Sequence, residues 1–268
     1  CQHNHGLGWP SFIQSLAYST PDGGVAYAVY GPNKATLDVA GGKRVTITED
    51  TRYPFSDTLR FTIAAKEKAK YPIYFRIPSW TTGAAAMVNG KLTGAPVAGE
   101  YLRIERTWKN GDRVELVFPM RLTVRRWPTN QNSASVNYGP LTLSLRIAEQ
   151  YRKVNSAEAA IGDSRWQEGA DPEKWPTWEI YAGSPWNYAL ILPDDNDVSR
   201  LTVRHKPWPA DNQPFTREGA PIEVTALGRL IPSWGIDGTG LTGVLPPASA
   251  KRSENVSPIT LIPMGAAR

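Results

Sequence analysis

The chain of 268 residues is long enough for one large domain or two of ordinary size. Its 41% of hydrophobic and 21% of charged residues are a globular balance, which excludes long disorder. The net charge of +5 invites a nucleic-acid function, but basic and acidic residues are interspersed, as in RIERTWKNGDRVE (103–115), so solvated strand faces explain the charge better. No apolar run approaches the roughly 20 residues that span a bilayer. We therefore expect a soluble protein with neither a nucleic-acid nor a membrane partner, in a compartment that the single cysteine leaves open.

One early segment is predicted to be helical. Pro10 suits the first turn of a helix, and apolar residues follow it at helical spacing. We predict a helix over 10–17, ended by the turn sequence TPDGG (20–24). A helix of two turns is too short to be stable alone, so it must pack on a neighbour, in this chain or outside it. The residues that share its apolar face are Trp9, Phe12, Ile13 and Leu16.

From residue 25 the apolar pattern changes to a period of two, which is typical of half-buried strands. Turn sequences rich in Gly, Pro and Asn separate these segments at the spacing of an antiparallel β-sandwich. Asn89-Gly90 is the strongest short signal for a hairpin. The strands expected in this first set cover 25–30, 35–39, 44–50, 58–65, 71–78, a hairpin over 84–94, 100–108 and 113–120.

A second set of strands follows, interrupted by a long stretch over about 150–187 that has no clear period. Such a stretch is unusual inside a compact domain and indicates a functional loop or an interface. It holds Trp166, Trp175, Trp178 and Trp186, which either stack on sugar rings or seal a surface between domains. The predicted fold class is all-β, with two antiparallel, jelly-roll-like β-sandwich domains. The later strands are expected over 121–128, 135–147, 188–193, 200–207, 221–230 and 259–265.

The only cysteine, Cys1, opens the chain together with His3 and His5. In an extended segment, C-x-H-x-H places three possible zinc ligands on one face. A free amino terminus with His3 could instead bind Cu(II) or Ni(II). A frayed terminus and a lipidated cysteine are two further interpretations. The residues alone do not decide among the four.

Other catalytic patterns are weak. His205 has no G-x-S-x-G partner, and GTGLTG (238–243) lacks the strand-to-helix setting of a nucleotide-binding turn. Glycoside hydrolysis needs a pair of carboxylates, and no spacing singles one out. The carboxylates available for such a pair include Glu49, Asp50, Asp57, Glu100 and Glu179.

Several stretches, in this order along the chain, resemble the β-L-arabinofuranosidases of glycoside hydrolase family 127 and their relatives. The resemblance is strongest over 1–145, and no single motif carries it alone. The stretches are CQHNHGLGWPSFIQSLAYSTPDGGVAYAVYGP (1–32), VTITEDTRYPFSDTLRFTI (45–63), YFRIPSW (74–80), AAAMVNGK (84–91), RVELVFPM (113–120), VNYGPLTLSL (136–145) and ITLIPMGAAR (259–268).

The resemblance implies a catalytic (α/α)₆ barrel followed by two β-sandwiches, the second inserted into the first. It places the tail of the barrel at 1–17, sandwich one at 18–120 plus 255–268, and sandwich two at 121–254. The implied activity is retaining hydrolysis of L-arabinofuranosides or related plant glycans. The implied nucleophile is a cysteine thiolate on a zinc ion that a glutamate and three cysteines bind.

Residues 1–4, Cys-Gln-His-Asn, match the C-x-x-N part of the family's C-C-x-x-N motif, so the resemblance implies that Cys1 is a zinc ligand. The nucleophile, the acid/base glutamate and the other ligands are expected upstream. We therefore expect this C-terminal portion to be inactive and zinc-free alone, and to brace the barrel of the same parent chain. His3 and His5 are candidates for substrate binding. The alternative is a stand-alone carbohydrate-binding or protein-interaction module.

Overall fold

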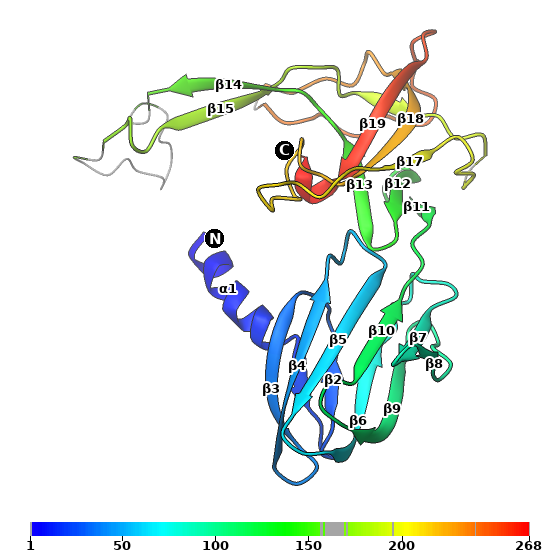
Figure 1. Cartoon of the computed structure of the whole chain (residues 1–268). Helices are drawn as coiled ribbons and strands as arrows, with labels where there is room; N and C mark the ends of the chain where they lie inside the picture. The colour runs from blue at the N-terminus through cyan, green and yellow to red at the C-terminus, as the bar shows by residue number, and fades with distance from the viewer. Residues whose placement is uncertain are drawn as a thin grey trace. The chain divides into compact units, whose positions relative to one another are not determined.

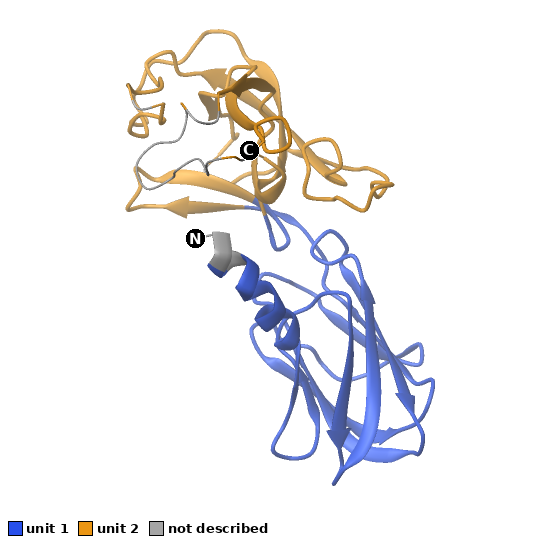
Figure 2. Cartoon of the chain, turned by 90° about the vertical axis from the view of Figure 1, so that its left-hand side faces the viewer, with its two compact units in different colours: residues 1–123, 137–141 blue, residues 124–136, 142–268 orange. Residues whose placement is uncertain are grey.

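The computed structural model describes residues 2–155, 158, 169, 171–194, 196–238 and 240–267. Strands dominate, which confirms the predicted all-β class; the jelly-roll topology stays a prediction. The chain divides into two compact units, one of residues 1–123 and 137–141 and one of 124–136 and 142–268 (Figure 2). In the described ranges the helical elements are α1 (Gln2–Gln14) and the 3-10 turn η1 (Met264–Ala266), and no helix is long and apolar enough to span a membrane.

The first unit is a sandwich of two sheets (Figure 1). In the smaller sheet, of order β1-β2-β6-β9, strands β2 and β6 are parallel, which the antiparallel prediction did not anticipate. Its strands are β1 (Ala17–Ser19), β2 (Val25–Tyr27), β6 (Ala69–Arg76) and β9 (Tyr101–Trp108). The larger sheet has the order β3-β4-β5-β10-β7-β8. Its strands are β3 (Asn33–Val39), β4 (Lys43–Thr51), β5 (Thr58–Ala65), β7 (Ala85–Val88), β8 (Lys91–Leu92) and β10 (Arg113–Val117).

Alternation along these strands builds the core between the two sheets. Along β5 every second side chain is buried, from Leu59 through Phe61 to Ile63, while the residues between them face outward. The ring of Phe61 lies 4.8 Å from that of Tyr27 and 5.0 Å from that of Phe75, between ring centroids. Because three large rings from both sheets meet in one cluster, their burial is a main source of the unit's stability.

The second unit is built on a sheet of order β11-β12-β13-β19-β18-β16, with β17 paired to β18 (Figure 1). Strand β18 carries buried Ile222, Val224 and Ala226, and β19 adds Ile259 and Leu261. The strands are β11 (Leu122–Trp127), β12 (Ser133–Tyr138), β13 (Leu141–Leu145), β16 (Tyr188–Leu190), β17 (Thr202–His205), β18 (Ile222–Leu230) and β19 (Ser257–Pro263).

The last strand corrects one part of the predicted domain division. We expected 255–268 to return to sandwich one, but β19 pairs with β13 and β18 in the second unit. The apolar side chains of β19 are buried there beside those of β18, which fixes its place. The other predicted boundaries stay a prediction.

The N-terminal helix also differs from its prediction. It begins at Gln2 rather than at residue 10, and Pro10 lies inside it. A proline removes one N–H donor from a helix without requiring the helix to start there, so the proline was a misleading start signal.

The stretch predicted to be irregular contains a hairpin of β14 (Glu149–Val154) and β15 (Thr177–Ala182). Its register runs from Glu149 opposite Ala182 to Val154 opposite Thr177. Most of its side chains are exposed on both faces, so the sequence shows no alternation that would have revealed it. Within the described residues the two strands form a sheet of their own, which is marginal in water unless something covers it.

Candidate functional site

The predicted site residues Cys1, His3 and His5 lie at the N-terminus, which the structure describes only in part. Cys1 lies outside the described residues, and His3 and His5 belong to α1 with side chains that are not described. Among the described residues, no three His, Cys, Asp or Glu side chains are grouped to hold a metal ion. Zinc needs three or four protein ligands, so a single cysteine cannot hold the ion. Cys1 as a metal ligand stays a prediction.

Of the carboxylates considered for hydrolysis, the adjacent Glu49 and Asp50 do not form a pair. Glu49 and Asp50 are neighbours on β4, so their side chains point to opposite faces of the sheet. Glu49 is buried in the sandwich and Asp50 is exposed. Glu179 lies in the hairpin of the second unit.

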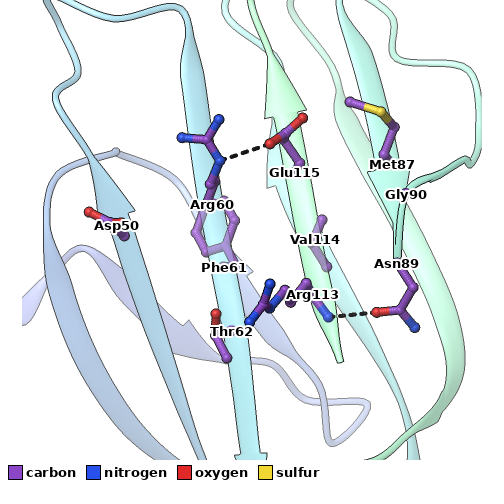
Figure 3. Close-up of a pocket in the computed structure, with 10 residues that line it drawn as sticks. All are labelled: Asp50, Arg60, Phe61, Thr62, Met87, Asn89, Gly90, Arg113, Val114 and Glu115. Atoms are coloured by element: carbon purple, nitrogen blue, oxygen red, sulfur yellow. Dashed lines mark hydrogen bonds and ion pairs between the residues drawn. The ribbon is translucent and has the colours of Figure 1, made fainter. Parts of the chain in front are cut away.

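A depression of about 590 Å³ lies on the outer face of the six-stranded sheet (Figure 3). Its floor is a row of side chains that follow one another across the strands: Asp50 on β4, Arg60 on β5, Glu115 on β10 and Met87 on β7. Arg60 Nε donates to Glu115 Oε2 at 2.9 Å. At one end, Asn89 Oδ1 accepts from the backbone N–H of Arg113 at 2.9 Å, which holds the tip of the β7–β8 hairpin against β10.

This depression is suited to binding rather than to hydrolysis. A glycosidase places a sugar–sugar bond between two carboxyl groups about 5 to 10 Å apart. Here the register places Arg60 between Asp50 and Glu115, so the guanidinium stands where that bond would lie.

The motifs behind the resemblance meet at one end of the sandwich. The Tyr30 hydroxyl donates to the carbonyl of Arg76 at 2.7 Å, and Arg76 Nε donates to the carbonyl of Ala28 at 2.6 Å. The Tyr30 ring lies 6.1 Å from that of Tyr53 and 5.5 Å from that of Phe118. YGP, YPF and FRIPSW therefore form one packed cluster of aromatic and backbone contacts, which gives these motifs a structural role.

Glu49 lies beside this cluster and is the most perturbed acid among the described residues. Oε1 accepts from Gly31 N at 3.1 Å and Oε2 from Asn33 Nδ2 at 2.7 Å. Burial raises the pKa of Glu49 to about 8, although both hydrogen bonds lower it. A perturbed carboxyl often marks a catalytic site. Glu49 is only 2% exposed and lies within the core, so no substrate reaches it and its role is structural.

The tryptophans of the long stretch divide into two kinds. Trp166 lies outside the described residues. Trp186 packs on Trp234 with ring centroids 5.2 Å apart, as expected of a structural residue. Trp175 and Trp178 are exposed on and beside the hairpin, where they could contact a partner.

Comparison with known proteins connects the sandwich to glycoside hydrolases. Residues 24–120 match the sequence profile of the middle domain of the β-L-arabinofuranosidases of family GH127. No protein of curated function matches the chain. A solved structure described as a glycoside hydrolase is similar over 94% of this chain, with 24% identity and a TM-score of 0.60. A GH127 β-L-arabinofuranosidase from Geobacillus stearothermophilus T6, Ara127N, is similar over 94%, with 18% identity and a TM-score of 0.59.

Within the first unit the chain is therefore similar to a domain of glycoside hydrolases. Over residues 24–120 the chain is similar to the GH127 middle domain, which confirms the resemblance predicted from its motifs. Because the two solved structures are only 24% and 18% identical to this chain, the comparison shows a shared fold and no more. The chain spans about a third of their length, 34% and 33% respectively.

Proposed function

We propose that this chain is the accessory β-sandwich region of a glycoside hydrolase that acts on L-arabinofuranosides or related plant glycans. It braces the helical catalytic barrel of the same parent protein and does not itself break the glycosidic bond. The observation that carries this proposal is the match of residues 24–120 to the middle domain of the β-L-arabinofuranosidases. For the intact parent protein, the same proposal includes a retaining mechanism and a zinc ion to which Cys1 contributes one of several ligands.

The helix α1 supports a docking role. Trp9 is 53% exposed, Phe12 45% and Ile13 59%, and the Trp9 and Phe12 rings meet edge to face with centroids 5.9 Å apart. A helix of 13 residues with apolar side chains in water is marginal unless a partner covers them. Leu16, which we expected on the same exposed face, is buried instead. We assign the catalytic barrel as the partner that covers α1.

The first test is enzymatic. The purified chain is incubated with 4-nitrophenyl β-L-arabinofuranoside, with and without added zinc. We expect no release of nitrophenol above the rate without protein, because Glu49 and Asp50 face opposite sides of their strand and no three possible metal ligands are grouped among the described residues. Turnover that scales with protein concentration would overturn the accessory role.

The second test addresses docking. Because α1 exposes apolar side chains, we expect the isolated chain to self-associate and to bind a hydrophobic dye. Replacing both Trp9 and Phe12 with Gln should abolish both properties, while the melting temperature stays unchanged because both side chains are exposed. The matched control is Leu92→Gln, which removes a side chain 78% exposed on β8 and should leave association and dye binding as they are. Equal behaviour of the wild type and the α1 variant would contradict docking through α1.

One observation favours a second function, that of a protein-interaction or carbohydrate-binding module. The hairpin exposes Trp178, Tyr151 and Tyr181 in a sheet of only two strands, an arrangement that a partner would stabilise. Under this alternative, loss of Trp178 would weaken binding of a partner, whereas loss of Trp9 and Phe12 would not.

A further inference from the structure

The outer face of the four-stranded sheet carries a depression of about 410 Å³ that belongs to neither α1 nor the hairpin. It combines aromatic rings, a proline ring and hydrogen-bonding groups. Its lining residues are Thr20, Pro21, Asp22, Ala26, Tyr74 and Tyr101. The side chains come from the turn after β1 and from β2, β6 and β9, so no single stretch of sequence reveals them.

The register of the sheet explains the hollow. Tyr18 on β1, Ala26 on β2 and Tyr74 on β6 lie opposite one another in a single row across the strands. Two strand spacings separate the two tyrosines, roughly 10 Å, and the side chain between them is a single methyl group. The space above Ala26 therefore admits a flat ring beside the Tyr74 ring. Tyr101, 48% exposed on β9, adds a second aromatic wall.

The polar groups at this site are held in place before any ligand arrives. The Tyr74 hydroxyl donates to Asp22 Oδ2 at 2.6 Å and accepts from Arg103 Nε at 3.0 Å. The Thr20 hydroxyl donates to Asp22 Oδ1. These hydrogen bonds from Thr20 and Tyr74 lower the pKa of Asp22, so it stays an ionised acceptor at neutral pH.

The turn that carries Asp22 is also rigid. Gly24 N donates to the Thr20 hydroxyl at 3.0 Å, and Thr20 N donates to the Gly24 carbonyl at 3.0 Å. A side chain at Gly24 would collide with the carbonyl of Pro72 on β6, so the turn lies directly on the sheet. A fixed turn lowers the entropy that binding would otherwise cost.

The charges favour a neutral ligand. Asp22 and Glu105 are balanced by Arg103 and Lys70, and Arg103 Nη2 lies 2.6 Å from Glu105 Oε2. A polyanion such as a nucleic acid would need an excess of cations. A sugar unit fits better, because its C–H face packs on an aromatic ring while its hydroxyls donate to a carboxylate and accept from a guanidinium.

We infer that the outer face of the four-stranded sheet binds a neutral sugar unit of a glycan chain, with Tyr74 and Tyr101 as the ring platform and Asp22 and Arg103 as the hydroxyl partners. This is a binding site and not a catalytic one. The inference rests on these side chains; only the choice of an arabinan probe rests on the proposed function.

The test is isothermal titration of the chain with α-1,5-linked arabinotriose and, separately, with cellotriose. We expect saturable binding of at least one of the two sugars and a loss of about tenfold in affinity in Tyr101→Ala, which corresponds to about 1.4 kcal/mol for the stacked ring. The matched control is Phe215→Ala, which removes an aromatic ring of equal exposure, 48%, from the second unit and should leave the affinity unchanged. Melting temperatures show that both variants are folded.

The possible results of the titration test the sugar site separately from the accessory role. Absence of binding of both sugars at millimolar concentration would overturn the inference, as would binding that Tyr101→Ala leaves intact or that Phe215→Ala removes. Binding of cellotriose but not arabinotriose would support the sugar site and count against arabinan as the parent's substrate. The nitrophenol and α1 measurements do not depend on this site, so the accessory role and the sugar site can fail separately.

Discussion

The sandwich of the first unit and the hairpin β14–β15 of the second use the same kinds of residues for opposite purposes. Both are rich in Tyr and Trp. In the sandwich a second sheet covers one face of the central strands, and Trp108 is 0% exposed. In the hairpin Trp178 is 48% exposed. An aromatic side chain is therefore buried only where a second layer packs on its strand, and the neighbouring residues in the sequence do not show whether that layer is present.

Trp108→Ala should have the largest effect. Its ring is fully buried, and Nε1 donates to the carbonyl of Tyr71 at 3.0 Å. Removing the ring leaves a cavity and an unpaired carbonyl, so we expect a loss of about 3–5 kcal/mol in the free energy of unfolding, measured by urea titration. Trp108→Phe, which keeps most of the volume, is the control and should lose clearly less. A loss below about 1 kcal/mol for the alanine variant would mean that buried Trp108 contributes no more to stability than an exposed tryptophan of the hairpin.

The next effect is a pH dependence that comes from Glu49. Its pKa is about 8 in the folded chain, against 4.5 as the ordinary value, with burial as the main cause. The folded state therefore holds a proton that the unfolded state has lost between these two pH values. Stability should be fully present below about pH 4.5, fall by up to a few kcal/mol as pH rises towards 8, and level off above that.

Urea midpoints measured from pH 5 to pH 8 test this dependence. Glu49→Gln keeps a neutral side chain of the same size, so it should flatten this part of the profile. Asp50→Asn, on the opposite, exposed face of the same strand, is the matched control and should leave the slope in place. An equal slope in the wild type and in Glu49→Gln would show that Glu49 is ionised in the folded chain.

Period-two patterning predicted most strands of the sandwich because most strands there have one buried face, as β5 does. The Asn89-Gly90 turn was also predicted, since both residues adopt the positive φ angles, 52° and 78°, that this hairpin requires. The hairpin β14–β15 was missed because neither of its faces is buried. Tyr74 and Tyr101 were missed as a site because β6 and β9 bring them together only in the folded sheet.

Trp178→Ala should have a much smaller effect than Trp108→Ala, although the same atoms are removed. Trp178 packs edge to face on Tyr151, with centroids 6.3 Å apart, and nearly half of its surface is in contact with solvent. We expect a loss of about 0.5 kcal/mol or less in the free energy of unfolding. Measurement at two protein concentrations sharpens the test. A loss above about 2 kcal/mol that grows with concentration would mean that a second molecule covers the hairpin.

The smallest effect is expected for the pair of Arg60 and Glu115 in the depression of the six-stranded sheet. Nε and Oε2 lie 2.9 Å apart, but the side chains are 61% and 34% exposed, so solvent screens their attraction. A double-mutant cycle with Arg60→Ala and Glu115→Ala should give a coupling of about 0.2–0.5 kcal/mol that disappears in 1 M salt. A coupling above about 1 kcal/mol that persists in salt would mean that the pair is shielded from water. In that case the outer face of this sheet would exclude water as the core does. Strands could then no longer be divided only into those that an opposing sheet covers and those that solvent surrounds.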